Sequence, residues 1–279
     1  MPATQIAVLG AIAGLTVYLG LPLGRLRTPA PRIKAFLGGV AIGILIFLLW
    51  DVLSNAWSVT TGALEAHHYG QATGYGAMML GCVGIGLLGL VYFDRWMGRR
   101  MRRLRPEGPG AATARPAAIP SGAEAARARA VQLSMLIAIG IGMHNFGEGL
   151  AIGASAAAGR ISLALLLVIG FGAHNATEGF GVIGPLAGAG ERPSWGRIGV
   201  LGLIAGGPTF LGTLLGQQVT SPLLMVAFLA LAAGSILYVV VELLAVARAT
   251  GFKVLITWAL LAGLVLGFVT DAILTAGGA

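Results

Sequence analysis

VQLSMLIAIGIGMHNFGEGLAIGASAAAGRISLALLLVIGFGAHNATEGFGVIGPL, residues 131–186, consists of two apolar runs joined by a short turn. A helix needs about 20 apolar residues to cross a bilayer, and each run, 131–157 and 161–186, is long enough. The turn AAGR near residues 157–160 is short, so the two helices must be antiparallel neighbours. This stretch therefore predicts a helical hairpin buried in a membrane.

The rest of the chain repeats the same kind of apolar run. Of its 279 residues 57% are hydrophobic and 10% are charged, whereas soluble domains have about 25% charged residues. Six further runs are long enough to span a bilayer: 5–23, 36–59, 71–93, 198–218, 222–247 and 254–276. We therefore expect an all-α membrane protein, an eight-span transmembrane helical bundle in which residues 1–279 form one domain. The 45 glycines would let these helices pack closely.

Positive charge is distributed unevenly among the connections between these runs. Of the 18 Lys and Arg residues, 17 fall in connections on one side of the bundle, and only Arg160 falls on the other. Cytoplasmic connections of membrane proteins carry the excess of positive charge. We therefore expect both termini outside, the basic connections in the cytoplasm, and a multi-pass protein of the inner cell membrane. Membrane orientation thus accounts for the net charge of +8, and we expect no nucleic-acid partner.

Residues 98–130, between the third and fourth runs, have a different composition. They are rich in Arg, Pro and Ala and show no apolar periodicity. Such a segment is typical of a linker. We expect a flexible basic cytoplasmic loop here, whose positive charge would contact anionic lipid headgroups, with protein binding as the alternative.

The hairpin contains the pattern His-Asn-x-x-Glu-Gly twice, although charged groups are costly inside a membrane. In the first copy His144 and Glu148 are four residues apart, so a helix places them on one face. Counted from Arg160, both copies lie roughly 18–27 Å from the turn and therefore at matching depth. The sequence predicts one mid-membrane cluster from two helices, formed by His144, Asn145, Glu148, His174, Asn175 and Glu178.

The chemistry of these side chains indicates a metal site. Imidazole nitrogens and carboxylate oxygens are ligands of Zn²⁺, and they also bind Fe²⁺, Mn²⁺ and Cd²⁺. Two carboxylates close together at this depth would need a cation to stay charged. Hydrogen bonding within the bundle is the structural alternative, but two copies with the same spacing favour metal binding.

The motifs HNFGEGLAIG (144–153) and HNATEGF (174–180) resemble the fourth and fifth helices of the ZIP (Zrt/Irt-like) metal-ion transporters. Eight spans, outside termini and a long loop between spans three and four are also similar to that family. The resemblance implies uptake of divalent metal ions into the cytoplasm, with zinc as the first candidate substrate. It implies metal-ligand roles for His144, Asn145, Glu148 and Glu178, with His174 and Asn175 at neighbouring ligand positions.

The sequence departs from the family pattern in three respects. The family usually has proline between the Asn and the Glu, where this chain has Gly147 and Thr177. In the sixth span Gly207 precedes Pro208, where the family often carries an acidic residue. Asn175 stands where Asp is common in the family. The absence of these two anionic ligands argues against a second metal ion beside the first.

Other acidic and histidine side chains lie along the predicted route. Similar family segments carry His or Glu at the position of Glu242, so we expect a role in metal exit, with a paired structural carboxylate as the alternative. Asp51, in the outer half of the second span, serves either metal access or a helix-packing hydrogen bond. The outside loop EAHHYG offers Glu65, His67 and His68 for metal capture, although such loop histidines are commonly only solvated.

Two other function classes use similar residues. An intramembrane metallohydrolase would place Glu directly after a ligand His, as in His-Glu-x-x-His, and here Asn follows each His. A redox bundle that binds haem or two iron ions is the other alternative. Di-iron bundles use Glu-x-x-His, in which the order of the two residues is the reverse of the order here. We therefore expect a transporter and no enzyme, with divalent metal ions and the lipid bilayer as partners and a homodimer as one candidate assembly.

Overall fold

The computed structural model describes all residues except 26–30, 104–121, 219–220 and 277–279, and every regular element in the described part is a helix. In chain order the elements are α1 (Ala3–Leu15), α2 (Val17–Gly20), the 3₁₀ helix η1 (Leu21–Arg25), α3 (Pro31–Glu65), α4 (Tyr69–Arg103), α5 (Gly122–Ala157), α6 (Ile161–Gly188), α7 (Trp195–Gly216), α8 (Pro222–Ala249) and α9 (Lys253–Ala276). α1, α2 and η1 together form the first span, so eight helical segments are long and apolar enough to cross a membrane. The predicted all-α, eight-span bundle is confirmed, whereas the side on which the termini lie stays a prediction.

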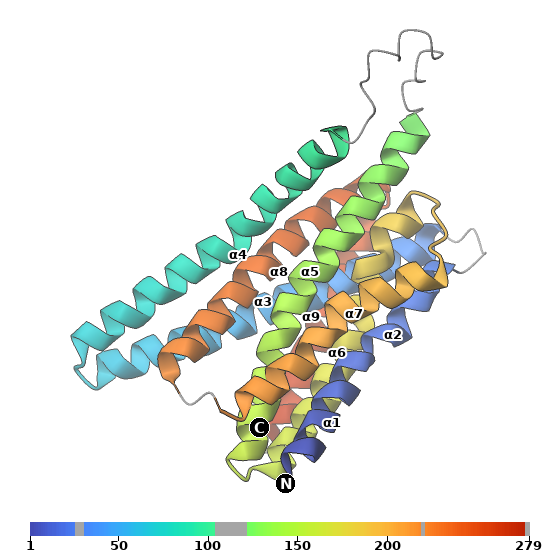
Figure 1. The fold of residues 1–279 in the computed structure, drawn as a ribbon. Helices are drawn as coiled ribbons and strands as arrows, with labels where there is room; N and C mark the ends of the chain where they lie inside the picture. Colours follow the sequence, from blue (N-terminus) through green and yellow to red (C-terminus); the bar gives the residue numbers. More distant parts are fainter. Residues whose placement is uncertain (26–30, 104–121, 219–220, 277–279) are drawn as a thin grey trace.

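The helices pack in two groups (Figure 1). α5 packs most extensively against α7, and α1 packs against α6 and α7. We call these helices, with α2, the motif group, because α5 and α6 carry the doubled motif. α3, α4, α8 and α9 pack mainly with one another and form the flanking group. The two groups meet chiefly where α8 contacts α5 and where α3 contacts α6.

Glycines allow the close crossing of α5 and α7. A Cβ atom on Gly212 would overlap the carbonyl oxygen of Phe146, and a Cβ atom on Gly149 would overlap the carbonyl oxygen of Thr209. Backbones can approach this closely only where a residue has no side chain. The crossing therefore fixes α5 against α7 directly beside Glu148.

The connections use residues that suit turns and helix starts. Gly159, between α5 and α6, has a φ of +77°, a left-handed conformation that glycine adopts without strain. α7 begins after Ser194, whose hydroxyl accepts a hydrogen bond from the Arg197 amide at 3.2 Å. α8 begins with Pro222, which suits the first position of a helix. The short turn between α5 and α6 confirms the predicted antiparallel hairpin.

The outer faces of the bundle are apolar. α4 is the least buried of the eight spans. Leu80, Ile169 and Val254, on three different helices, are 70–73% exposed. Backbone groups in the bilayer core must be satisfied within the helices, and apolar side chains on these faces suit contact with lipid. The faces therefore agree with a multi-pass membrane protein.

The prediction of a loop over residues 98–130 is wrong at both ends. α4 continues to Arg103 and α5 already begins at Gly122, so both flanks of the segment are helical. Ala, Arg and Glu are frequent in these flanks and favour helix, and this local preference outweighs the missing apolar period. Residues 104–121, the middle of the predicted loop, lie outside the described residues.

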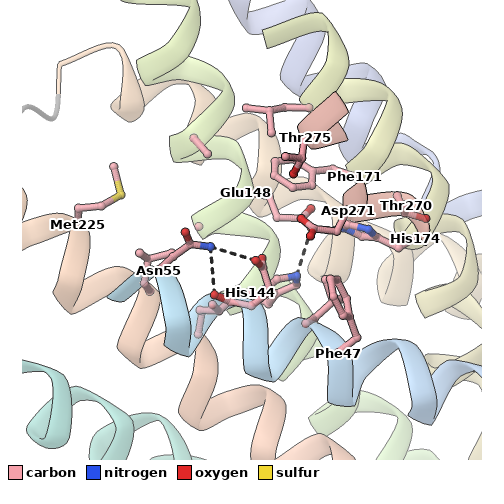
Figure 2. A pocket seen from close by; sticks show the side chains of 18 of the residues that line it. Phe47, Asn55, His144, Glu148, Phe171, His174, Met225, Thr270, Asp271 and Thr275 are labelled. Carbon is pink, nitrogen blue, oxygen red and sulfur yellow. Dashed lines mark hydrogen bonds and ion pairs between the residues drawn. The ribbon is translucent and has the colours of Figure 1, made fainter. Parts of the chain in front are cut away.

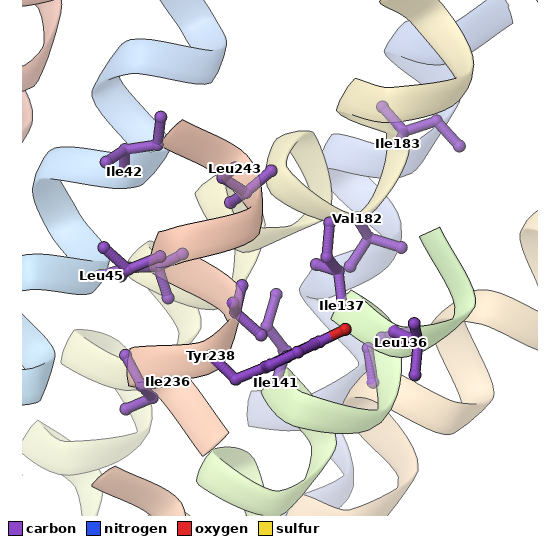
Figure 3. Close-up of a cluster of buried hydrophobic side chains, with 14 of the residues drawn as sticks. Ile42, Leu45, Leu136, Ile137, Ile141, Val182, Ile183, Ile236, Tyr238 and Leu243 are labelled. Carbon is purple, nitrogen blue, oxygen red and sulfur yellow. The ribbon is translucent and has the colours of Figure 1, made fainter. Parts of the chain in front are cut away.

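A layer of buried apolar side chains fills the bundle where the two groups meet (Figure 3). Its members come from α3, α5, α6 and α8: Ile42, Leu45, Leu136, Ile137, Ile141, Val182, Ile183, Ile236, Tyr238 and Leu243. Ile141 is three residues before His144, and Val182 is four residues after Glu178. This set, which we call the apolar layer, therefore begins about one helical turn from the predicted metal cluster.

Candidate metal site

The two copies of the motif face each other across the α5–α6 hairpin. Within α5, His144 Nε2 lies 3.1 Å from Glu148 Oε1. His174 Nε2, on α6, forms a hydrogen bond with the same Glu148 oxygen. Glu148 therefore lies between two imidazole rings that come from different helices (Figure 2).

These side chains form a compact set of metal-binding atoms. One ligand atom from each of His144, Glu148 and His174 lies within 4.8 Å of the others. Glu178 Oε1 lies 3.9 Å from His144 Nε2. His144, Glu148 and Glu178 are each 5% exposed or less. The structure thus brings the two histidines and two glutamates of the motif together in one buried cluster, with the nitrogen and oxygen donors that Zn²⁺ accepts.

Several buried oxygens of this cluster have no hydrogen-bond partner. They are Oε2 of Glu148 and both carboxylate oxygens of Glu178. Burial of an unpartnered carboxylate is unfavourable, and a second carboxylate nearby makes it more so. A divalent cation would supply the missing interactions. The donor set therefore fits an ion of the zinc class better than it fits a closed hydrogen-bond network.

The two asparagines of the motif connect the cluster helices to their neighbours. Asn145 Nδ2 donates to the Ala205 carbonyl of α7 at 3.1 Å. Asn175 Nδ2 donates to the Ala13 carbonyl of α1 at 3.2 Å. Both side chains are fully buried, and in both the Oδ1 atom has no hydrogen-bond partner. Each amide group thus has a positioning contact through nitrogen, and the predicted role of its oxygen as a metal ligand stays a prediction.

A cavity of about 520 Å³, lined mostly by apolar side chains and by a few polar ones, leads to this cluster. His144, Glu148 and His174 form part of its wall, and α3 and α9 of the flanking group contribute Asp51 and Asp271 (Figure 2). Further lining residues near the ends of the helices, among them Val59, Leu163 and Thr275, extend the cavity toward the end of the bundle where α1 begins and α9 ends. The metal cluster therefore lies between this cavity on one side and the apolar layer on the other.

Asp271 was not predicted as part of the site, because its place near the end of the last span suggests only an interfacial residue. The packing of α9 against α3 brings it into the same cavity as Asp51. Its acidic charge within a predicted span is the only signal in the sequence that could have identified it. Asp51 itself accepts a 3.1 Å hydrogen bond from Asn55, one turn along the same helix α3, and it also lines the cavity, so its role in metal access stays a prediction.

The chain is also similar to known zinc transporters, although no family model matches it. The zinc transporter ZupT of Escherichia coli O7:K1 is 30% identical over 232 residues, which cover 81% of this chain and 80% of that protein. The chain belongs to the ZIP family. The ZupT proteins of Salmonella arizonae and Salmonella heidelberg are 28% and 29% identical over the same share of the chain. The family resemblance predicted from the two motifs is confirmed.

The two motif positions where the family resemblance places proline, Gly147 and Thr177, lie within helices in this structure. α5 runs through Gly147 without interruption, and no atom lies within 4 Å of the space that a Cβ would occupy there. In α6 the Thr177 hydroxyl donates to the His174 carbonyl at 2.7 Å. Both helices thus stay continuous beside the cluster.

Glu242 lies away from the cluster of histidine and glutamate side chains in this ZIP protein. It is on α8, four residues after Tyr238 of the apolar layer, and its Oε2 atom lies 3.8 Å from Nη2 of Arg129. Glu242 does not line the cavity described above. This position suits the paired structural carboxylate that the sequence left open, and its role in metal exit stays a prediction.

The predicted capture residues of this ZIP chain lie at the exposed turn between α3 and α4. Glu65, His67 and His68 are all exposed. His67 has a φ of 58°, and its Nδ1 atom is 3.2 Å from the Tyr69 hydroxyl. None of these residues lines the cavity, so metal capture at this turn stays a prediction.

Replacement of Asp271 by Asn is expected to raise the KM for zinc flux by up to about tenfold while the maximal rate changes little. The carboxylate lines the cavity and would concentrate cations there, although it does not belong to the cluster of His144, Glu148, His174 and Glu178. Flux should be measured over a range of zinc concentrations in liposomes at low and high salt, because salt screens the effect. An unchanged KM at low salt would exclude this role.

Proposed function

We propose that this protein transports divalent metal ions, zinc foremost, across the inner cell membrane into the cytoplasm. The observation that supports this most strongly is the position of Glu148 between His144 and His174, with Glu178 beside them, at one end of the cavity. The relatives from Escherichia and Salmonella are named zinc transporters. Fe²⁺, Mn²⁺ and Cd²⁺ compete as substrates in this proposal, because the same donor atoms bind them.

The proposed path starts in the cavity, on the side that the distribution of positive charge assigns to the outside. Asp51 and Asp271 attract the hydrated ion, and the central histidines and glutamates then replace its water. Mixed nitrogen and carboxylate ligands bind strongly enough to remove water and weakly enough to permit release. The apolar layer has to open before the ion passes toward Glu242 and the cytoplasm.

We further propose that the cluster holds one ion at a time. His144, Glu148, His174 and Glu178 are the central ligands, and the free oxygens of Asn145 and Asn175 are additional ligands. The motif supplies only two carboxylates, which balance the charge of a single divalent ion. The homodimer stays a candidate assembly.

An intramembrane metalloenzyme and a redox bundle are the alternatives that use the same side chains. The zinc transporter names of the relatives favour transport over both. In addition, one oxygen of Glu148 contacts both imidazoles, which suits a ligand shared between the two helices.

The full chain, purified and inserted into liposomes, is expected to move zinc along its gradient to an indicator trapped inside. Addition of Fe²⁺, Mn²⁺ or Cd²⁺ should reduce the zinc signal in proportion to the affinity of each ion for the cluster. Ca²⁺ and Mg²⁺ should compete poorly, because they prefer oxygen-only sites. Correctly inserted protein that gives no metal flux above empty liposomes would contradict the proposal.

A further inference from the structure

An ion-pair network joins the two helix groups at the end of the bundle opposite to the cavity. Arg129, near the start of α5, places Nη1 at 3.1 Å from Oδ1 and 3.3 Å from Oδ2 of Asp94 on α4. Its Nη2 atom lies 3.8 Å from Oε2 of Glu242 on α8. Gln132, on α5, donates to Asp94 Oδ1 at 2.6 Å and to the Asp94 carbonyl at 3.2 Å. All of these contacts cross from the motif group to the flanking group.

The position of the network relates it to the apolar layer. Arg129 lies fifteen residues before His144, which is about 22 Å along α5. Leu136 lies between them, and Glu242 follows Tyr238 by one turn, so the network covers the apolar layer on the side away from the metal cluster. When the cavity is accessible and the layer is packed, this network is closed.

A second arginine on the same helix, Arg127, pairs with a carboxylate of its own helix group. Arg127 forms an ion pair with Glu191, in the connection between α6 and α7, and Glu191 Oε1 is also 3.5 Å from Arg197 Nη1 of α7. These contacts remain within the motif group. Two arginines two residues apart therefore differ in one respect: only the contacts of Arg129 would break if one group moved against the other.

We propose that Arg129, with Asp94, Gln132 and Glu242, is a latch between the helix groups. It stabilises the arrangement in which the cavity is open and the apolar layer is closed, and it opens in each transport cycle. The existence of a cycle rests on the proposed transport function, whereas the latch itself concerns the balance between two arrangements of the helices.

The exposure of the latch residues suits a contact that must break repeatedly. The side chains of Arg129, Asp94 and Glu242 are 51%, 19% and 24% exposed. Ion pairs that are partly solvated contribute modestly to stability, whereas a fully buried pair would be costly to separate. The latch can therefore bias the two arrangements without preventing the change between them.

The test measures the accessibility of two reporter cysteines in the full chain, reconstituted in nanodiscs in which both sides are open to reagent. Cys82 is first replaced by Ser, and Cys is then introduced at Leu167, in the cavity wall, or at Leu243, in the apolar layer. Arg129→Gln is expected to lower the labelling rate at position 167 and to raise it at position 243, each by about two- to fivefold. Arg127→Gln is the matched control and should leave both rates unchanged.

A charge exchange separates a latch from a purely structural role. Arg129→Asp combined with Asp94→Arg restores an opposite-charge pair across the same groups, and both labelling rates should return toward those of the parent. Unchanged rates in Arg129→Gln, equal changes in Arg127→Gln, or a rise at both positions that the exchange does not reverse would each overturn the proposal. The labelling needs no metal ion, so a negative flux experiment would refute the transport function and leave this result interpretable.

Discussion

Replacement of Glu148 by Gln is expected to reduce zinc flux by at least about 100-fold. Mutation of a residue that only hydrogen-bonds to a metal ligand already costs about 10–100-fold in metal affinity, and loss of a ligand should cost more. Glu148 is the one carboxylate in contact with both imidazoles, from His144 and His174. Glutamine keeps the shape but removes the negative charge and one of the two donor oxygens. Initial zinc flux into liposomes and zinc binding by calorimetry in detergent should both show the loss.

The control for this variant is Glu124→Gln, which removes an exposed carboxylate near the other end of the same helix. It carries the same chemical change and should retain nearly full flux. Wild-type flux in Glu148→Gln protein would show that the cluster is not the transport site. Reduced flux with unchanged zinc affinity would assign Glu148 to the transport step and not to binding.

Replacement of Gly212 by Val is expected to lower the unfolding temperature of the protein by roughly 5–10 °C, because overpacking costs about 1–3 kcal/mol and this contact is with backbone. The new side chain would overlap the Phe146 carbonyl of α5, which cannot rotate away as a side chain could. Tryptophan fluorescence during heating in detergent measures the change. Zinc flux should fall as well, because the crossing lies beside Glu148.

Gly81→Val is the matched control for packing. Gly81 lies on α4, and no atom is within 4 Å of the space that its Cβ would occupy. The same substitution there should change the unfolding temperature by no more than a few degrees. Equal effects at the two positions would show that the α5–α7 crossing has no special role in stability.

The eight spans could be predicted because lipid imposes a simple requirement on sequence. A chain in the bilayer has to satisfy its backbone within each helix and present apolar side chains outward, so run length alone locates the spans. The central cluster was predictable for a related reason. Helical spacing fixes His144 relative to Glu148, and the short turn at Gly159 fixes the two helices relative to each other.

The surroundings of the cluster could not be predicted, because they depend on contacts between helices that are distant in sequence. Asp271 enters the cavity only because α9 packs against α3. The amide groups of Asn145 and Asn175 turn toward carbonyl oxygens of α7 and α1, whose positions no local pattern reveals. Arg129 lies in the segment expected to be a loop, so its contact with Glu242 could not be predicted from the sequence.

The short turn between α5 and α6 has a consequence for how an ion could be carried. All four proposed ligands lie on these two helices, which belong to one group and are joined by three residues outside either helix. A displacement of this group past its neighbours would leave the coordination sphere intact, so the ion would travel as cargo within a rigid body. Release would then depend on hydration of the ion at the far side, and not on the ligands being pulled apart.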